Sequence, residues 1–164
     1  MKQQGASKLE FTLALAVIAV AAVVILERLA QLEEYAEKTA MDATVLNITA
    51  GLRAEIGNYI IHGEENRIAA LTGSNPLRWL TQPPPGYLGE LAAPPRAPAD
   101  GAWWFETSRR ALCYRPKLRH RLVVGDAEAG LCWRIEPVGG SGSSSGRAAV
   151  AWVRLAPLGE YRWF

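Results

Sequence analysis

A long apolar run near the N-terminus constrains this chain more than any other feature of its sequence. Residues 11–26 carry almost only hydrocarbon side chains, and Leu29 extends the run after a short charged interruption. A helix that spans a membrane needs about 20 apolar residues, with a lower limit near 17. Counted from Leu9, the segment reaches that lower limit, so it can serve as a membrane anchor.

The charges on either side of the run predict its orientation. Lys2 and Lys8 precede it, and an acidic stretch follows it. Positive flanks are retained in the cytoplasm. The sequence therefore predicts a single-pass membrane protein with its N-terminus in the cytoplasm and everything after Leu29 outside it.

Helical periodicity continues beyond the apolar run. Apolar residues recur at steps of three and four in two successive sets: Leu29, Leu32, Ala36, Ala40 and Ala43, then Val45, Ile48, Leu52, Ile56 and Ile60. The change of stripe between the sets indicates that the lower half faces other helices and the upper half faces a sheet. Gly63 is a plausible stop, and a helix over residues 9–62 would be about 80 Å long.

The last third of the chain has the pattern of short antiparallel strands. They are rich in aromatic and branched residues and are expected at residues 103–107, 110–114, 119–124, 130–136 and 148–155, with loops at 125–130 and 139–146. Together with the long helix they predict an α+β fold, with the helix packed on an antiparallel sheet. Cys113 and Cys132 would lie within strands and can form a disulfide if their Cα atoms come within about 7 Å. Oxidising conditions outside the cytoplasm favour that pairing.

The residues before the apolar run have a distinctive order. A basic leader ends in Gly5, Ala6 follows, and Glu10 stands fifth if the chain is cut after Gly5. This order resembles the class III signal of type IV pilins and of type II secretion pseudopilins. The resemblance covers about residues 1–30. It implies cleavage between Gly5 and Ala6 by a prepilin peptidase, methylation of the new amine, and a role for Glu10 in assembly. In a filament, the Glu10 carboxylate would meet the N-terminal amine of a neighbouring subunit, so that each buried charge gains a partner.

The same resemblance implies the organisation and use of the rest of the chain. Residues 1–5 would be the leader, 6–29 the transmembrane and assembly helix, 30–63 its periplasmic continuation, 64–101 a Pro-rich connecting region, and 102–164 the sheet head. Within 64–101, short helical turns are expected at 64–71 and 75–80. Ala6 and Lys8 depart from the family pattern, which favours a minor pilin or pseudopilin over a major pilin. The resemblance also implies that the chain is first held in the lipid of a bacterial inner membrane, with its C-terminal domain in the periplasm. Its partners would be prepilin peptidase and then other subunits, in a pilus or a type II secretion filament.

The distribution of charge is uneven, although the net charge is only +2. Residues 27–67 hold eight acids and four bases, whereas residues 106–164 hold ten bases and five acids. Complementary fields can steer association between subunits. A polarised surface that is merely solvated is the equal alternative.

No pattern in the sequence indicates catalysis or a cofactor. His62 and His120 are the only histidines, no zinc spacing occurs, and no phosphate loop or nucleophile elbow is present. We therefore expect no enzyme activity, no cofactor and no metal. The alternatives are an adhesive pilin that binds DNA or a surface, and a signal-anchored periplasmic protein. The modest charge makes nucleic acid an improbable partner. Tryptophans in the strand region could form a binding face with the arginines, but core packing is the commoner role.

Overall fold

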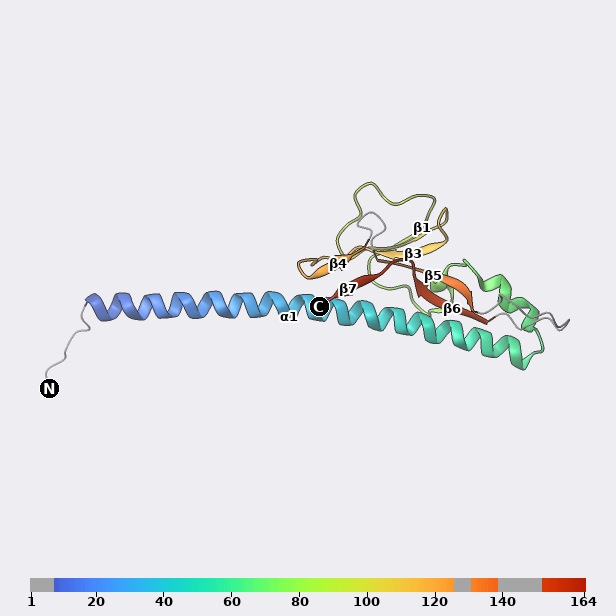
Figure 1. Cartoon of the computed structure of the whole chain (residues 1–164), viewed down its shortest axis with the longest axis horizontal. Helices are drawn as coiled ribbons and strands as arrows, with labels where there is room; N and C mark the ends of the chain where they lie inside the picture. Colours follow the sequence, from blue (N-terminus) through green and yellow to red (C-terminus); the bar gives the residue numbers. More distant parts are fainter. Residues whose placement is uncertain (1–7, 126–130, 139–151) are drawn as a thin grey trace.

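One long helix runs through most of the molecule (Figure 1). The computed structural model describes residues 8–125, 131–138 and 152–164, and helix α1 spans Lys8–Ile61. Its 54 residues correspond to a length of about 80 Å. Gly63, with φ of 70°, ends the helix, and the N–H of Glu64 donates to the carbonyl of Tyr59 (2.8 Å). The predicted helix and its glycine stop are therefore confirmed.

Two short 3-10 helices follow α1. The first, η1, spans Glu65–Leu71, and the second, η2, spans Pro76–Trp79. The side chain of Asn75 caps η2 by accepting a hydrogen bond from the N–H of Leu77 (3.0 Å). Both turns lie where the sequence predicted them.

The head contains two sheets. Its strands are β1 (Tyr87–Leu91), β2 (Trp103–Glu106), β3 (Ala111–Tyr114), β4 (Leu122–Val124), β5 (Leu131–Val138), β6 (Trp152–Pro157) and β7 (Tyr161–Trp163). Five of them form one sheet in the order β1-β2-β3-β5-β6, and β4 pairs with β7 in a separate ribbon. Among the described strands, only the β1–β2 pair is parallel. The α+β fold, with a long helix packed on a mostly antiparallel sheet, is confirmed.

Two strands were not predicted, and one begins late. β1 lies inside residues 64–101, where a connection without strands was expected. Gly86 and Gly89, both with positive φ, obscure its pattern. β7 is too short to show an alternation. β4 begins at Leu122 instead of residue 119, and it pairs outside the main sheet. The predicted loop at 139–146, most of the one predicted at 125–130 and the start of the strand predicted at 148–155 lie outside the described residues.

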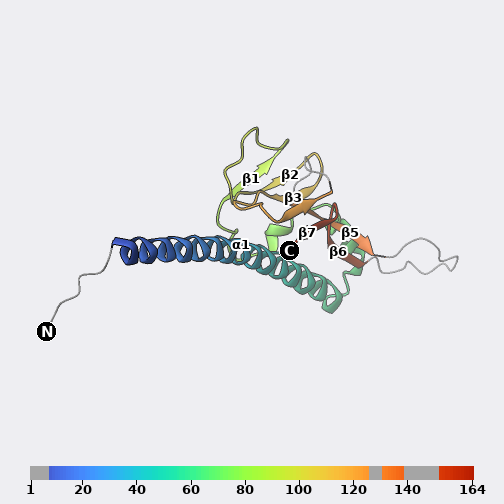
Figure 2. The ribbon, with the colours of Figure 1, turned by 60° about the vertical axis from the view of Figure 1, so that its left-hand side comes forward.

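The upper half of α1 supplies the helix side of the core. Ile48, Leu52 and Ile56 are at most 3% exposed and pack under the sheet, as the second apolar set predicted. The set ends early, because Ile60 is 40% exposed. Figure 2 shows the head lying along this half of the helix only, so the lower half extends beyond it.

Candidate assembly surface

The lower half of α1 is an apolar surface that no other described part of the chain covers. Its large side chains are mostly 50–77% exposed: Leu9, Phe11, Leu13, Leu15, Val17, Ile18, Val20, Val23, Val24, Ile25, Leu26, Leu29 and Leu32. The most apolar window of 18 residues has a mean hydropathy of 2.7, and none of it is buried. This half of the helix is long and apolar enough to cross a membrane.

Glu10 lies on this surface. It is exposed and stands in the first turn of α1, next to Phe11, which is 66% exposed. An acidic side chain in the first turn of a helix interacts favourably with the helix dipole. Gly5 and Ala6, the predicted processing residues, lie outside the described residues.

Glu34 fastens the head to the helix just above the apolar half. It is 3% exposed, although it carries a carboxylate. Its Oε1 accepts hydrogen bonds from the backbone N–H of Arg121 and from the indole Nε1–H of Trp163, both at 3.0 Å. A buried charge is tolerated where such donors replace the water that it loses. Glu34 therefore ties β7 and the residue that precedes β4 to one point on α1.

Glu37, one turn further along α1, forms a second attachment. Its carboxylate accepts hydrogen bonds from the backbone N–H groups of Lys117 (2.6 Å) and Leu118 (2.9 Å) and from the hydroxyl of Tyr114 (2.8 Å). Burial, and then the hydrogen bond and charge of Glu37, raise the pKa of Tyr114 well above its ordinary value. The neutral phenol is thus the form that the folded head holds.

An aromatic pair lies beside these attachments. The ring of Phe164 stacks on that of Tyr35 with centroids 3.9 Å apart and planes 12° from parallel. The guanidinium of Arg121 lies 5.7 Å from the Phe164 ring centroid. Figure 1 shows the C-terminus against α1 at the end of the head nearest the apolar half. The pair therefore sits at the junction between head and apolar helix.

These attachments give two acids of residues 27–67 a role within the chain itself. Glu34 and Glu37 are two of the eight acids in residues 27–67, which were expected to be able to steer a neighbouring subunit. Instead, both accept hydrogen bonds from the head of their own chain. Asp42 pairs with Lys38 and Glu64 with Arg67 along the helix. Of the acids on the first turns above the apolar run, Glu33 remains exposed.

Sequence reasoning missed Glu34, although a signal was present. Glu34, Met41 and Ile48 are spaced by seven residues, and all three are buried on one face of α1. Residues seven apart lie on the same side of a helix. A carboxylate in line with buried apolar residues needs hydrogen-bond donors from the part of the chain that covers them. The position of Glu34 in this line therefore indicated that the head reaches at least this far along α1.

The tryptophans of the strand region belong mainly to the core. Trp103, Trp104, Trp133 and Trp163 are at most 8% exposed, whereas Trp152 is 51% exposed. Trp103 and Trp133 stack on each other, with centroids 5.8 Å apart, on the helix side of the sheet. The core interpretation is confirmed for these four, and they offer no aromatic binding face.

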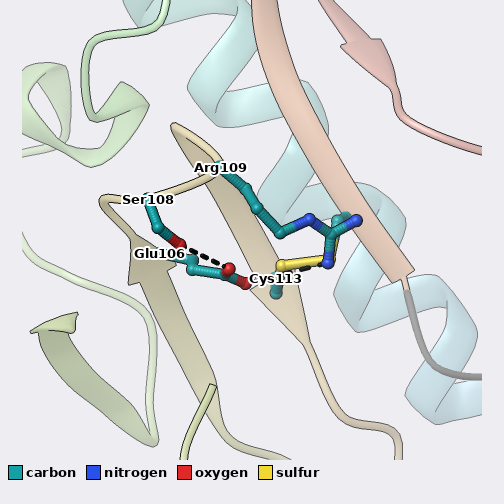
Figure 3. Close-up of a disulfide and its surroundings, with 5 residues drawn as sticks. Glu106, Ser108, Arg109 and Cys113 are labelled. Atoms are coloured by element: carbon teal, nitrogen blue, oxygen red, sulfur yellow. Dashed lines mark hydrogen bonds and ion pairs between the residues drawn. A yellow bond between two sulfur atoms is a disulfide. The ribbon is translucent and has the colours of Figure 1, made fainter. Parts of the chain in front are cut away.

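The predicted disulfide between Cys113 and Cys132 is present. The two residues are directly opposite each other on β3 and β5, with Cα atoms 4.1 Å apart. Figure 3 shows it beside the β2–β3 turn, where Ser108 Oγ donates to Glu106 Oε1 at 2.8 Å and Arg109 Nη1 lies 3.7 Å from Glu106 Oε2. It joins two neighbouring strands inside the five-stranded sheet.

No chemical centre is evident in the part of the chain that the structure describes. Among those residues, no group of three or more histidine, cysteine or carboxylate side chains could hold a metal ion. Comparison with known proteins found no matching family model, no similar curated sequence and no similar solved structure.

Proposed function

We propose that this protein is a structural subunit of a type IV pilus or a type II secretion filament, in the role of a minor pilin or pseudopilin. The observation that carries the proposal is the division of α1 into two halves. One half is covered by the head, and the other presents thirteen large apolar side chains within residues 9–32. A surface of this size needs either lipid or other copies of the same helix around it.

The two environments correspond to two stages. Before assembly, the apolar half anchors the chain in the inner membrane, with the head in the periplasm. After cleavage between Gly5 and Ala6, the same half becomes part of the filament core. There, Glu10 pairs with the N-terminal amine of a neighbouring subunit, because either charge alone in an apolar core would be costly.

The N-terminus of the mature protein tests this proposal directly. In cells that have a prepilin peptidase, mass spectrometry should find a chain that begins with N-methylated Ala6. An intact Met1 would contradict the proposal and favour a signal-anchored periplasmic protein.

Filament incorporation tests the role of Glu10 separately. The Glu10→Ala variant should be processed and membrane-bound but should be lost from sheared filaments. Glu33→Ala, which removes an exposed acid outside the apolar run, is the matched control and should be incorporated normally. Equal incorporation of both variants would disprove the role of Glu10.

A further inference from the structure

The base of the head is the part of it that comes closest to the apolar half of α1. From Lys117 to Arg121 the backbone runs toward the N-terminal end of α1. The N–H of Lys117 donates to Glu37, and the N–H of Arg121 donates to Glu34. Phe164 reaches the same level at Tyr35. Among the described residues, these are the hydrogen bonds and ring contacts of the head nearest to the N-terminus of α1. We call Lys117, Arg119, Arg121, Tyr35 and Phe164 the basal collar.

The collar lies within reach of a lipid headgroup layer. Leu29 is the last residue of the predicted membrane segment, and Glu34 follows it by five residues, or about 7.5 Å of helix. The polar layer on each side of a bilayer is about 5–7 Å thick. The collar would therefore stand at the outer boundary of the headgroups, and side chains of lysine and arginine are long enough to enter that layer.

The collar also carries exposed positive charge. Lys117, Arg119 and Arg121 are all exposed. Within the described residues, Lys117 and Arg121 form no ion pair, and Arg119 lies 3.9 Å from Asp100, which bonds more closely to Arg115 (3.0 Å). Glu34 and Glu37 keep their negative charge, but Glu34 is buried, Glu37 is half-buried, and neither forms an ion pair with these exposed side chains; their oxygens accept hydrogen bonds from backbone N–H groups instead.

Two exposed aromatic rings complete the collar. Tyr35 is 46% exposed and Phe164 is 37% exposed, although they stack on each other. Aromatic side chains are enriched at the boundary between lipid and water. Basic side chains close to a membrane are attracted by anionic headgroups within about a Debye length, or 8 Å at physiological salt.

We propose that the basal collar binds the phosphate groups of anionic phospholipids on the periplasmic face of the membrane that α1 spans. This proposal rests on the membrane-anchored stage of the proposed function. The bound lipid holds the head upright on the membrane before the subunit is extracted. Among the exposed side chains described at this level, one acid, Glu33, stands against three bases, whereas the charges of Glu34 and Glu37 are held inside the attachment of the head.

The test uses the full chain in lipid nanodiscs at one chain per disc, which excludes contact with a second copy. Both natural cysteines are in the disulfide, so His120→Cys provides a single free thiol in the collar loop for an environment-sensitive fluorophore. Quenching by acrylamide, which is uncharged, is compared between discs of neutral phosphatidylcholine and discs containing phosphatidylglycerol. We expect at least about two-fold weaker quenching in the anionic discs, and loss of the difference in about 0.5 M salt.

Two triple variants in the labelled chain make the test specific. Lys117→Gln, Arg119→Gln and Arg121→Gln together should abolish the difference. Arg53→Gln, Arg78→Gln and Arg154→Gln, which remove three exposed arginines far from the collar, should preserve it.

Each remaining outcome has a defined meaning. If the chain stays in the disc but quenching is equal in both lipids, the collar does not bind anionic lipid, and the proposed function is unaffected. If shielding occurs only with two chains per disc, the collar binds a second copy and the lipid proposal is overturned. If the chain does not remain with the disc at all, both the anchor and the collar are disproved.

Discussion

At the scale of single residues, carboxylates attach the head to the helix. Glu34 and Glu37 together accept five hydrogen bonds from three kinds of donor: three backbone N–H groups, one indole and one phenol. Hydrogen bonds to charged groups contribute about 1.5–3 kcal/mol each, and more is lost if a buried donor is left without an acceptor. These two side chains therefore determine how firmly the lower edge of the head is held.

Replacement of Glu34 should loosen that edge. Glu34→Ala leaves the Arg121 N–H and the Trp163 Nε1–H without their acceptor, so we expect a loss of about 3 kcal/mol in the free energy of unfolding. Denaturant unfolding followed by tryptophan fluorescence measures the change. Glu33→Ala, at the adjacent exposed position, should change stability by less than about 0.5 kcal/mol. Equal effects of the two substitutions would contradict the attachment.

Tyr114 should make the head sensitive to alkali. Its pKa is raised from 10.0 in the folded state, by burial first and then by Glu37, so folding favours the protonated phenol. The folded state thus binds this proton more tightly than the unfolded state. The associated stability is complete below pH 10 and is lost as the pH rises above it. Tyr114→Phe should therefore show a shallower decline in unfolding free energy above pH 10 than the natural chain. Parallel curves for the two proteins would be inconsistent with this assignment.

At the scale of elements, the two halves of α1 have different surroundings. Its upper half is held by η1, η2 and the sheet, and its lower half by none of the described elements. Two glycines in the upper half differ in how closely other parts of the chain pack against them. Gly51 faces η2, where an added Cβ would lie 3.1 Å from both the Cβ and the carbonyl oxygen of Trp79. At Gly57, an added Cβ would meet nothing within 4 Å.

Alanine substitutions should separate these two glycines. Gly57→Ala should stabilise the head by about 0.5–1 kcal/mol, because alanine favours the helix and fits without a clash. Gly51→Ala should destabilise it, since the backbone carbonyl of Trp79 cannot rotate away from the new methyl group. Thermal unfolding of the two variants in parallel measures both effects. A similar gain in melting temperature for both would show that η2 does not pack tightly on α1.

At the scale of the whole molecule, the apolar run that could anchor the chain and the core of the head use separate residues. Val20 is 66% exposed and lies near the middle of the apolar run, far from any contact of the head. A charge there matters only where the helix is surrounded by hydrocarbon. The division of α1 thus predicts that membrane insertion can be impaired without damage to the fold.

Val20→Asp tests this separation. A charged residue at the centre of a membrane helix costs about 2.5–3.5 kcal/mol on insertion scales, so the variant should be recovered less in the carbonate-resistant membrane fraction. Its head should unfold at the same denaturant concentration as the natural head, measured in detergent. Val20→Leu is the control and should behave as the natural chain in both assays. Unfolding of the Val20→Asp head at a lower concentration would show that the apolar half does contribute to the fold.

Some of this architecture could be read from the residues, since local signals agree with it. The 3.6-residue periodicity and the absence of proline before Pro76 predict the helix, and Gly63 ends it. Most strands of the head show enough aromatic and branched residues to be found. β1 could not be found, because glycines interrupt it and its parallel partner β2 is distant in sequence.

The sequence by itself determined a long helix with an apolar lower half, a strand-rich head and a pair of cysteines able to bridge, because each depends on residue type and spacing along the chain. Only the tertiary structure decided where the head ends on the helix. That limit depends on Glu34 and Glu37 meeting donors more than 75 residues away, at Tyr114, residues 117–121 and Trp163. A carboxylate is most stable in water, and it can be buried only where the fold supplies hydrogen-bond donors in place of the water molecules that it loses.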